Sequence, residues 1–378
     1  MFGFFIMGFV DIIGLAINYV KQDFVFLNDT LANLLAMSCF FWFLVLSIPT
    51  GMLMNKIGRK KTVLLSFAIQ VIALGIPIMV YDFVWILVAF AFLGIGNTLL
   101  QVALNPLVTD VVSKEKLTGT LTLGQFVKAV CSFLGPIITS WASGMIFGWK
   151  LIFPIYAATS LIALVWLWLT PIKESKKEES VSLHQTLGLF KDKYIVAFFV
   201  GILVLVGVDV GINTTFPKLL MEKCGLQLSE AGLGNSVYFF ARTLGTLGGG
   251  IFLLKYSETK FFRYSVLLAL VGLAGMLVTE SLWGMLACVT IFGLGYANLF
   301  AIIFSLSLKR VPDRANEVSA LLIMGVSGGA LLPPLLGMVS DTFGTQVAAL
   351  IVIAVVWLYM VWLISKVKEK NRKQLTNQ

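Results

Sequence analysis

Long runs of apolar residues, separated by short polar segments, recur along the whole chain. A helix needs about 20 mostly apolar residues to cross the hydrocarbon core of a membrane, and twelve runs are that long or nearly so. The predicted spans are residues 2–20, 29–54, 62–80, 83–111, 118–146, 149–170, 193–220, 229–254, 261–279, 282–308, 315–340 and 345–366. The pattern therefore predicts an all-α membrane protein with twelve transmembrane helices.

The two halves of this pattern repeat each other at an offset of about 198–199 residues. The run at 93–96 (Leu-Gly-Ile-Gly) matches the run at 292–295 (Phe-Gly-Leu-Gly), and Asp11 matches Asp209. A duplicated six-helix unit places a cavity between two pseudo-symmetric bundles, an architecture found in secondary transporters. The expected parts are an N-terminal bundle, a cytoplasmic linker, a C-terminal bundle and a cytoplasmic tail, at residues 1–172, 173–192, 193–366 and 367–378.

Composition and charge agree with a membrane protein. Hydrophobic residues make up 58% of the chain and charged residues 12%, whereas soluble proteins carry about 25% charged residues. The net charge of +9 would suit nucleic-acid binding, but 22 of the 28 Lys and Arg residues fall on one side of the predicted membrane. This bias follows the positive-inside rule and places both termini in the cytoplasm. The first span lacks a basic leader and a cleavage site, so we expect it to be retained.

No motif for catalysis, metal binding or a cofactor is present. Cys39, Cys131 and Cys288 lie in predicted spans and Cys224 lies near the outer end of another. None of these spacings suggests a metal site or a disulfide framework. The single histidine, His184, is expected to be a solvated residue of the linker. We therefore expect neither an enzyme nor a cofactor.

The segment between the second and third spans carries a recognisable motif. It reads Gly51-Met-Leu-Met-Asn55-Lys-Ile-Gly58-Arg59-Lys-Lys-Thr. This resembles the signature loop of the major facilitator superfamily, G-x-L-x-D-x-x-G-R-K/R-x-x, with Asn55 in place of the usual acidic residue. The resemblance implies a transporter that alternates between two conformations. Asp110, at the inner end of the fourth span, is the expected partner of Arg59.

The fourth and fifth spans are similar to those of the fucose/galactose–proton symporter group of that superfamily. The fourth reads Gly94-Ile-Gly-Asn97-Thr-Leu-Leu-Gln101-Val-Ala-Leu-Asn105-Pro, and the fifth places Gln125 after a small polar stretch. This resemblance implies cotransport of a sugar with a proton. Two positions depart from it, because Gln101 replaces a glutamate thought to take the proton and Lys128 replaces an asparagine.

Ionisable residues inside spans are candidates for function, because each costs about 2.5–3.5 kcal/mol to insert. Four lie well inside: Asp11, Lys128, Asp209 and Arg242. Asp11 and Lys128 both fall roughly 14–15 Å from the inner ends of their helices, so we expect them to pair in the N-terminal half. Asp209 and Arg242 are expected to pair in the C-terminal half. Either both pairs are structural, or a proton, Lys128 and the substrate compete for Asp11, which would then be the protonation site.

Uncharged polar residues add a candidate sugar-binding surface. Asn97, Gln101 and Asn105 recur every four residues and therefore share one helix face. Amides both donate and accept hydrogen bonds, which suits the hydroxyl groups of a sugar; the alternative is interhelical bonding. Further candidate positions on the predicted cavity are Asn18, Gln125, Asn213, Tyr238 and Asn298.

Three functions are compatible with these residues. The leading hypothesis is a proton-coupled sugar transporter of the inner membrane, for which a monomer suffices. The first alternative is a carrier of an organic anion or sugar acid that uses Lys128 and Arg242. The second is a transporter-like nutrient sensor. A neutral-sugar carrier predicts that Lys128→Gln retains substrate binding, whereas an anion carrier predicts its loss.

Overall fold

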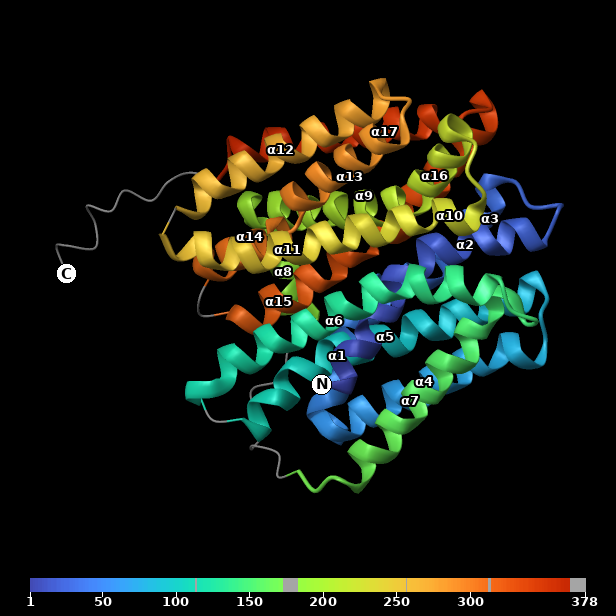
Figure 1. Cartoon of the computed structure of the whole chain (residues 1–378). Coiled ribbons are helices and arrows are strands. Elements are labelled where there is room, and N and C mark those ends of the chain that lie inside the picture. The colour runs from blue at the N-terminus through green and yellow to red at the C-terminus, as the bar shows by residue number, and fades with distance from the viewer. Residues whose placement is uncertain (113, 173–182, 256, 312–313, 368–378) are drawn as a thin grey trace.

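The computed structural model is built from helices packed in two groups (Figure 1). It describes residues 1–112, 114–172, 183–255, 257–311 and 314–367. Half of the predicted linker and nearly all of the predicted tail lie outside the described residues, so the domain boundaries stay predictions. The side chain of Asn55 also lies outside the described part of the chain.

The first half consists of six long helical segments, which we call rods, and some of them include a short 3₁₀ turn. Their bounds are α1 (Phe2–Met7), the 3₁₀ turn η1 (Gly8–Ile12) and α2 (Ile13–Asp23) for the first rod, then α3 (Asp29–Ile57), α4 (Arg59–Met79), α5 (Phe83–Val111), α6 (Lys114–Ser143), and η2 (Gly148–Leu151) with α7 (Ile152–Leu169). Pro49, Pro77 and Pro106 lie inside α3, α4 and α5.

The second half repeats this order after two short elements, α8 (Leu183–Gly188) and η3 (Leu189–Lys191). Its rods are α9 (Lys193–Cys224), α10 (Leu228–Ala231) with α11 (Leu233–Lys255), α12 (Glu258–Val278), α13 (Leu282–Tyr296) with α14 (Leu299–Arg310), α15 (Ala315–Met324) with η5 (Gly325–Ser327) and α16 (Gly328–Phe343), and α17 (Gln346–Ile364).

Within the described residues, eleven helical segments are long and apolar enough to cross a membrane. Helix α11 is the twelfth long rod, and it is more polar because it carries Arg242 together with several threonines and glycines. The prediction of an all-α membrane protein with twelve helices in two six-helix bundles is confirmed.

Each half has its own apolar core. Phe4 and Phe43 are among the fully buried side chains of the first core, and Phe292 and Trp357 among those of the second. The halves lie side by side in Figure 1, with the blue-to-green half below the yellow-to-red half. We call one end of the structure the termini end. At this end α1 begins, and α3, α5 and α17 end. The other end, where α2 finishes and α3 begins, is the opposite end.

Three predicted spans are interrupted near their middles, which the sequence pattern did not indicate. The span at 2–20 contains η1, the span at 315–340 contains η5, and the span at 282–308 breaks between α13 and α14. Short 3₁₀ segments inside helices often mark hinges. At Gly8, the first residue of η1, a Cβ atom would lie 2.9 Å from the carbonyl oxygen of Lys128. The first rod can approach α6 this closely only because Gly8 has no side chain.

Candidate functional site

The N-terminal half contains the ion pair expected between Asp11 and Lys128. Asp11 lies in η1 and Lys128 in α6, and the Lys128 Nζ atom is 3.8 Å from Asp11 Oδ1. The Ser132 hydroxyl donates a 2.6 Å hydrogen bond to Asp11 Oδ2. A separation of 3.8 Å exceeds a hydrogen-bond length. Asp11 is therefore held firmly by Ser132 and loosely by Lys128.

The C-terminal half contains the expected pair of Asp209 and Arg242 in a tighter arrangement. Arg242 donates to Asp209 Oδ2 at 2.8 Å, and the Tyr238 hydroxyl donates to Asp209 Oδ1 at 2.5 Å. The guanidinium carbon also lies 5.2 Å from the centre of the Tyr296 ring, within cation–π range. Charge-assisted bonds of this length are strong. Of the two carboxylates, Asp209 is therefore the one held more tightly by its cation.

The amide stripe of α5 spans a gradient of exposure. Gln101 donates to Asn97 Oδ1 at 2.8 Å, so two members of the stripe bond each other. Asn97 is fully buried, and its Nδ2 has no hydrogen-bond partner among the described residues. Asn105, nearer the termini end, is exposed, as is Gln125 on α6. The stripe therefore runs from the buried middle of the bundle toward solvent at the termini end.

A second group of amides lies where α2, α9 and α11 meet. Asn18 donates to the carbonyl of Thr214 at 3.0 Å, and Asn235 donates to the carbonyl of Asn213 at 2.8 Å. The side-chain oxygens of Asn18, Asn213 and Asn235 are buried and have no partner among the described residues. An unsatisfied buried acceptor costs about 1–3 kcal/mol. These oxygens can accept hydrogen bonds from a hydroxyl group that enters the interface.

Several predicted site residues have structural partners instead. The Tyr238 side chain is fully buried and its hydroxyl is committed to Asp209. Asn298, at the break between α13 and α14, donates to the carbonyl of Gly245 at 2.7 Å and so ties this break to α11. Asn235 was not predicted from the sequence. Its only signal is an amide near the start of the polar helix α11.

The signature loop joins α3 to α4 by a tight turn. Gly51 is buried in α3. Gly58 has a φ of 98°, a conformation that favours glycine over residues with a side chain. Arg59 then donates to Asp110 Oδ1 at 2.8 Å, which confirms the expected pair. The loop is thereby fastened to the end of α5 within the N-terminal half.

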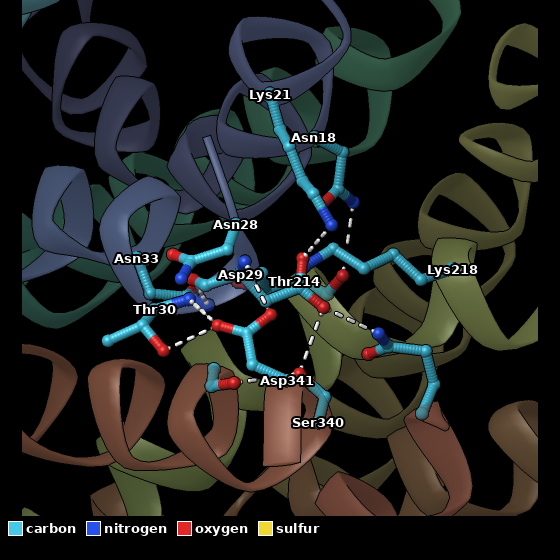
Figure 2. A network of polar contacts seen from close by, with 12 residues as sticks. Asn18, Lys21, Asn28, Asp29, Thr30, Asn33, Thr214, Lys218, Ser340 and Asp341 are labelled. Atoms are coloured by element: carbon cyan, nitrogen blue, oxygen red, sulfur yellow. Dashed lines mark hydrogen bonds and ion pairs between the residues drawn. The ribbon is translucent and has the colours of Figure 1, made fainter. Parts of the chain in front are cut away.

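At the opposite end, a polar network centred on Asp29 joins the two halves (Figure 2). Asp29 begins α3, and its side chain is 3% exposed. The C-terminal half supplies three donors to this carboxylate: Lys218 of α9 at 2.8 Å, Ser340 of α16 at 2.9 Å and Gln346 of α17 at 2.6 Å. Lys21 of α2 adds a fourth at 2.5 Å.

Asp341 of α16 makes the reciprocal contact. Its carboxylate accepts the backbone N–H groups of Asp29 at 2.9 Å and Thr30 at 2.7 Å, and the Thr30 hydroxyl at 2.5 Å (Figure 2). The first N–H groups of a helix lack partners within the helix and attract negative charge. An acid of the C-terminal half therefore caps a helix of the N-terminal half. This network was not predicted from the sequence, because its residues lie near the ends of helices, where polar residues are common.

The sequence matches known transporters along its whole length. The family model of the Major Facilitator Superfamily matches residues 1–217 and 199–378. The glucose/galactose transporter of Brucella abortus is 25% identical over 370 residues, covering 92% of this chain and 88% of that protein. The nitrite extrusion protein of Bacillus subtilis is 25% identical over 338 residues, covering 83% of this chain and 82% of that protein.

Among solved structures, the fold resembles a crystal structure of the E. coli fucose:proton symporter, FucP. The TM-score is 0.69, with 16% sequence identity over 97% of this chain and 98% of the symporter. The relatives are transporters and not enzymes. The chain is a multi-pass membrane protein that belongs to the major facilitator superfamily.

Proposed function

We propose that this protein is a secondary active transporter that moves a sugar across the plasma membrane together with a proton. The relatives named for glucose, galactose and fucose support a sugar as cargo. The buried amide oxygens of Asn18, Asn213 and Asn235, together with the α5 stripe, supply acceptors and donors for sugar hydroxyls.

In this proposal the termini end faces the cytoplasm, because most Lys and Arg residues outside the spans lie at that end. The Asp29 network then closes the outer side of the cavity. Asn105 and Gln125, which are exposed nearer the termini end, line the path to the cytoplasm. Alternating access requires the Asp29 network to break while the termini end closes. The interruptions at η1, η5 and the α13–α14 break are the places where the helices can bend.

The observation that carries proton coupling is the loose Asp11–Lys128 pair. Low dielectric favours the neutral carboxylic acid, whereas a nearby ammonium group favours the carboxylate. If Lys128 moved away from Asp11, the carboxylate would lose its positive partner, and a bound proton could take the place of that partner. Because η1 is a 3₁₀ turn inside the first rod, bending there moves Asp11 relative to α6. Movement of the halves and protonation of Asp11 are coupled in this way.

Uptake into proteoliposomes tests the proposal. Asp11→Asn is expected to abolish sugar accumulation driven by a pH gradient, while exchange of labelled for unlabelled sugar continues because it needs no net proton movement. Ser132→Ala is the milder companion variant, since it removes the 2.6 Å bond to Asp11 but leaves the carboxyl group in place. Full pH-driven accumulation by Asp11→Asn would show that Asp11 is not the protonation site.

A second candidate function is transport of a small anion. Two observations favour it: the Lys128 ammonium is not hydrogen-bonded to Asp11, and one relative is named for nitrite extrusion. An anion could bind Lys128 directly in place of Asp11. Uptake of neutral hexoses compared with sugar acids and nitrite in the same vesicles decides between the two cargoes.

A further inference from the structure

A groove on the lipid-facing side of the N-terminal half runs between α4 and α7. It is open to the outside, has a volume of about 350 Å³ and is lined by Leu64, Leu65, Ala68, Leu164, Val165 and Trp168. The lining is entirely apolar apart from the indole N–H of Trp168. The two helices run antiparallel, since α4 begins and α7 finishes at the termini end.

The end of this groove is marked by a basic and an aromatic residue. Lys61 lies one helical turn before Leu64 and Leu65, so it continues the same face of α4 toward the termini end. Trp168 occupies the corresponding place on α7, one turn after Leu164. Trp168 is 68% exposed, as expected of a tryptophan at the level of lipid headgroups.

Lys60 and Lys61 have different roles at this end. The Lys60 ammonium donates to the carbonyl oxygens of Trp168 at 3.2 Å and Thr170 at 2.7 Å, and so caps the C-terminal end of α7. The partial negative charge of this helix end is thereby neutralised. Lys61 is exposed and makes no ion pair with another described residue. Its charge is therefore directed to the membrane surface at the mouth of an apolar groove.

We propose that this groove is a binding site for one anionic phospholipid of the cytoplasmic leaflet, with an acyl chain between α4 and α7 and the headgroup phosphate at Lys61. The proposal rests on the cytoplasmic orientation of the termini end, and not on the identity of the cargo. Anionic lipids are attracted to basic residues at this leaflet. A second copy of the chain is disfavoured as the occupant, because a symmetric contact would bring the two Lys61 side chains together.

The internal repeat provides a matched control. Lys260 lies 199 residues after Lys61, near the start of α12, and is also exposed. The positions equivalent to Leu64 and Leu65 are Arg263 and Tyr264, so the helical turn that follows the lysine of the C-terminal half is polar. Removing either lysine changes the net charge equally, but only Lys61 is predicted to hold a lipid.

The test is native mass spectrometry of the delipidated full chain, titrated with phosphatidylglycerol or with phosphatidylcholine of the same acyl chains. One phosphatidylglycerol should bind in preference to phosphatidylcholine. Lys61→Gln should weaken its binding about fivefold, the contribution of one basic residue at a membrane surface. Ala68→Trp, which fills the groove, should abolish binding, and Lys260→Gln should leave it unchanged.

Three results would overturn the proposal. Equal binding of the two lipids would mean unspecific annular lipid only. Equal losses from Lys61→Gln and Lys260→Gln would mean a general effect of charge. Dimers that form when lipid is removed, and that Ala68→Trp abolishes, would make a second copy of the chain the occupant of the groove.

Discussion

The network at Asp29 gives a sharp prediction for the conformational equilibrium. In Asp29→Asn, Lys218 loses its carboxylate partner while its side chain is only 11% exposed in the closed opposite end. Breaking one partner of a buried pair costs about 3–5 kcal/mol. Opening the end to water relieves this penalty, so the cost falls on the closed state alone. Lys21, the other cation that contacts Asp29, is partly exposed, so leaving it unpaired costs less. We therefore take the lower figure of about 3 kcal/mol, which corresponds to roughly a hundredfold shift toward the open state.

The assay is a distance measurement between two spin labels at the opposite end, at Val25 and Val278, in a background without native cysteines. The two side chains are 97% and 81% exposed, and they belong to different halves. Wild type should give mostly the short distance, and Asp29→Asn mostly a longer one. Asp23→Asn is the control, because Asp23 accepts from Tyr81 and Trp149 within the N-terminal half. An unchanged distance in Asp29→Asn, or an equal change in Asp23→Asn, would refute the reasoning.

Three further predictions concern the packing and the charges. Arg242→Gln leaves Asp209 without its cation and should lower stability by about 3–5 kcal/mol; an unchanged melting temperature in detergent would contradict this. A Cβ at Gly337 would lie 2.5 Å from the carbonyl oxygen of Asp29 in the other half. Gly337→Val should therefore push the halves apart at this end and favour the long spin-label distance. The control is Gly75→Val, because nothing lies within 4 Å of a Cβ at that position. Lys128→Gln should still be stabilised by neutral sugars in a thermal-shift assay, and loss of that effect would favour the anion carrier.

The helices and the ion pairs within each half could be predicted from the sequence, for a simple reason. A charge in an apolar run is conspicuous, and its depth follows from the helical rise. Asp11–Lys128 and Asp209–Arg242 were predicted in this way, Arg59–Asp110 was predicted from the resemblance of the signature loop, and all three pairs form. The role of the polar residues was harder to predict, because the same amide can face a cavity or bond its neighbour, as Asn97 does with Gln101.

The contacts between the halves could not be predicted from these patterns. Asp29 and Asp341 lie 312 residues apart, at helix ends where acidic and other polar residues are common. Whether these two residues meet depends on how the two bundles are tilted against each other. This tilt produces no periodic pattern of apolar and polar residues in the sequence. The helix interruptions were missed for a related reason. Gly8 and Gly325 read as ordinary glycines of membrane helices, and tight packing against α6 and α9 distinguishes them only in three dimensions.

The cap that Asp341 places on α3 makes the backbone itself a reporter of the transport cycle. When the halves separate at this end, the amide hydrogens of Asp29 and Thr30 lose their acceptor and meet water. Their rate of exchange with deuterium would then measure how often the opposite end opens, without any label or substitution. A sugar that holds the protein closed on this side would slow that exchange, and one that draws it open would speed it.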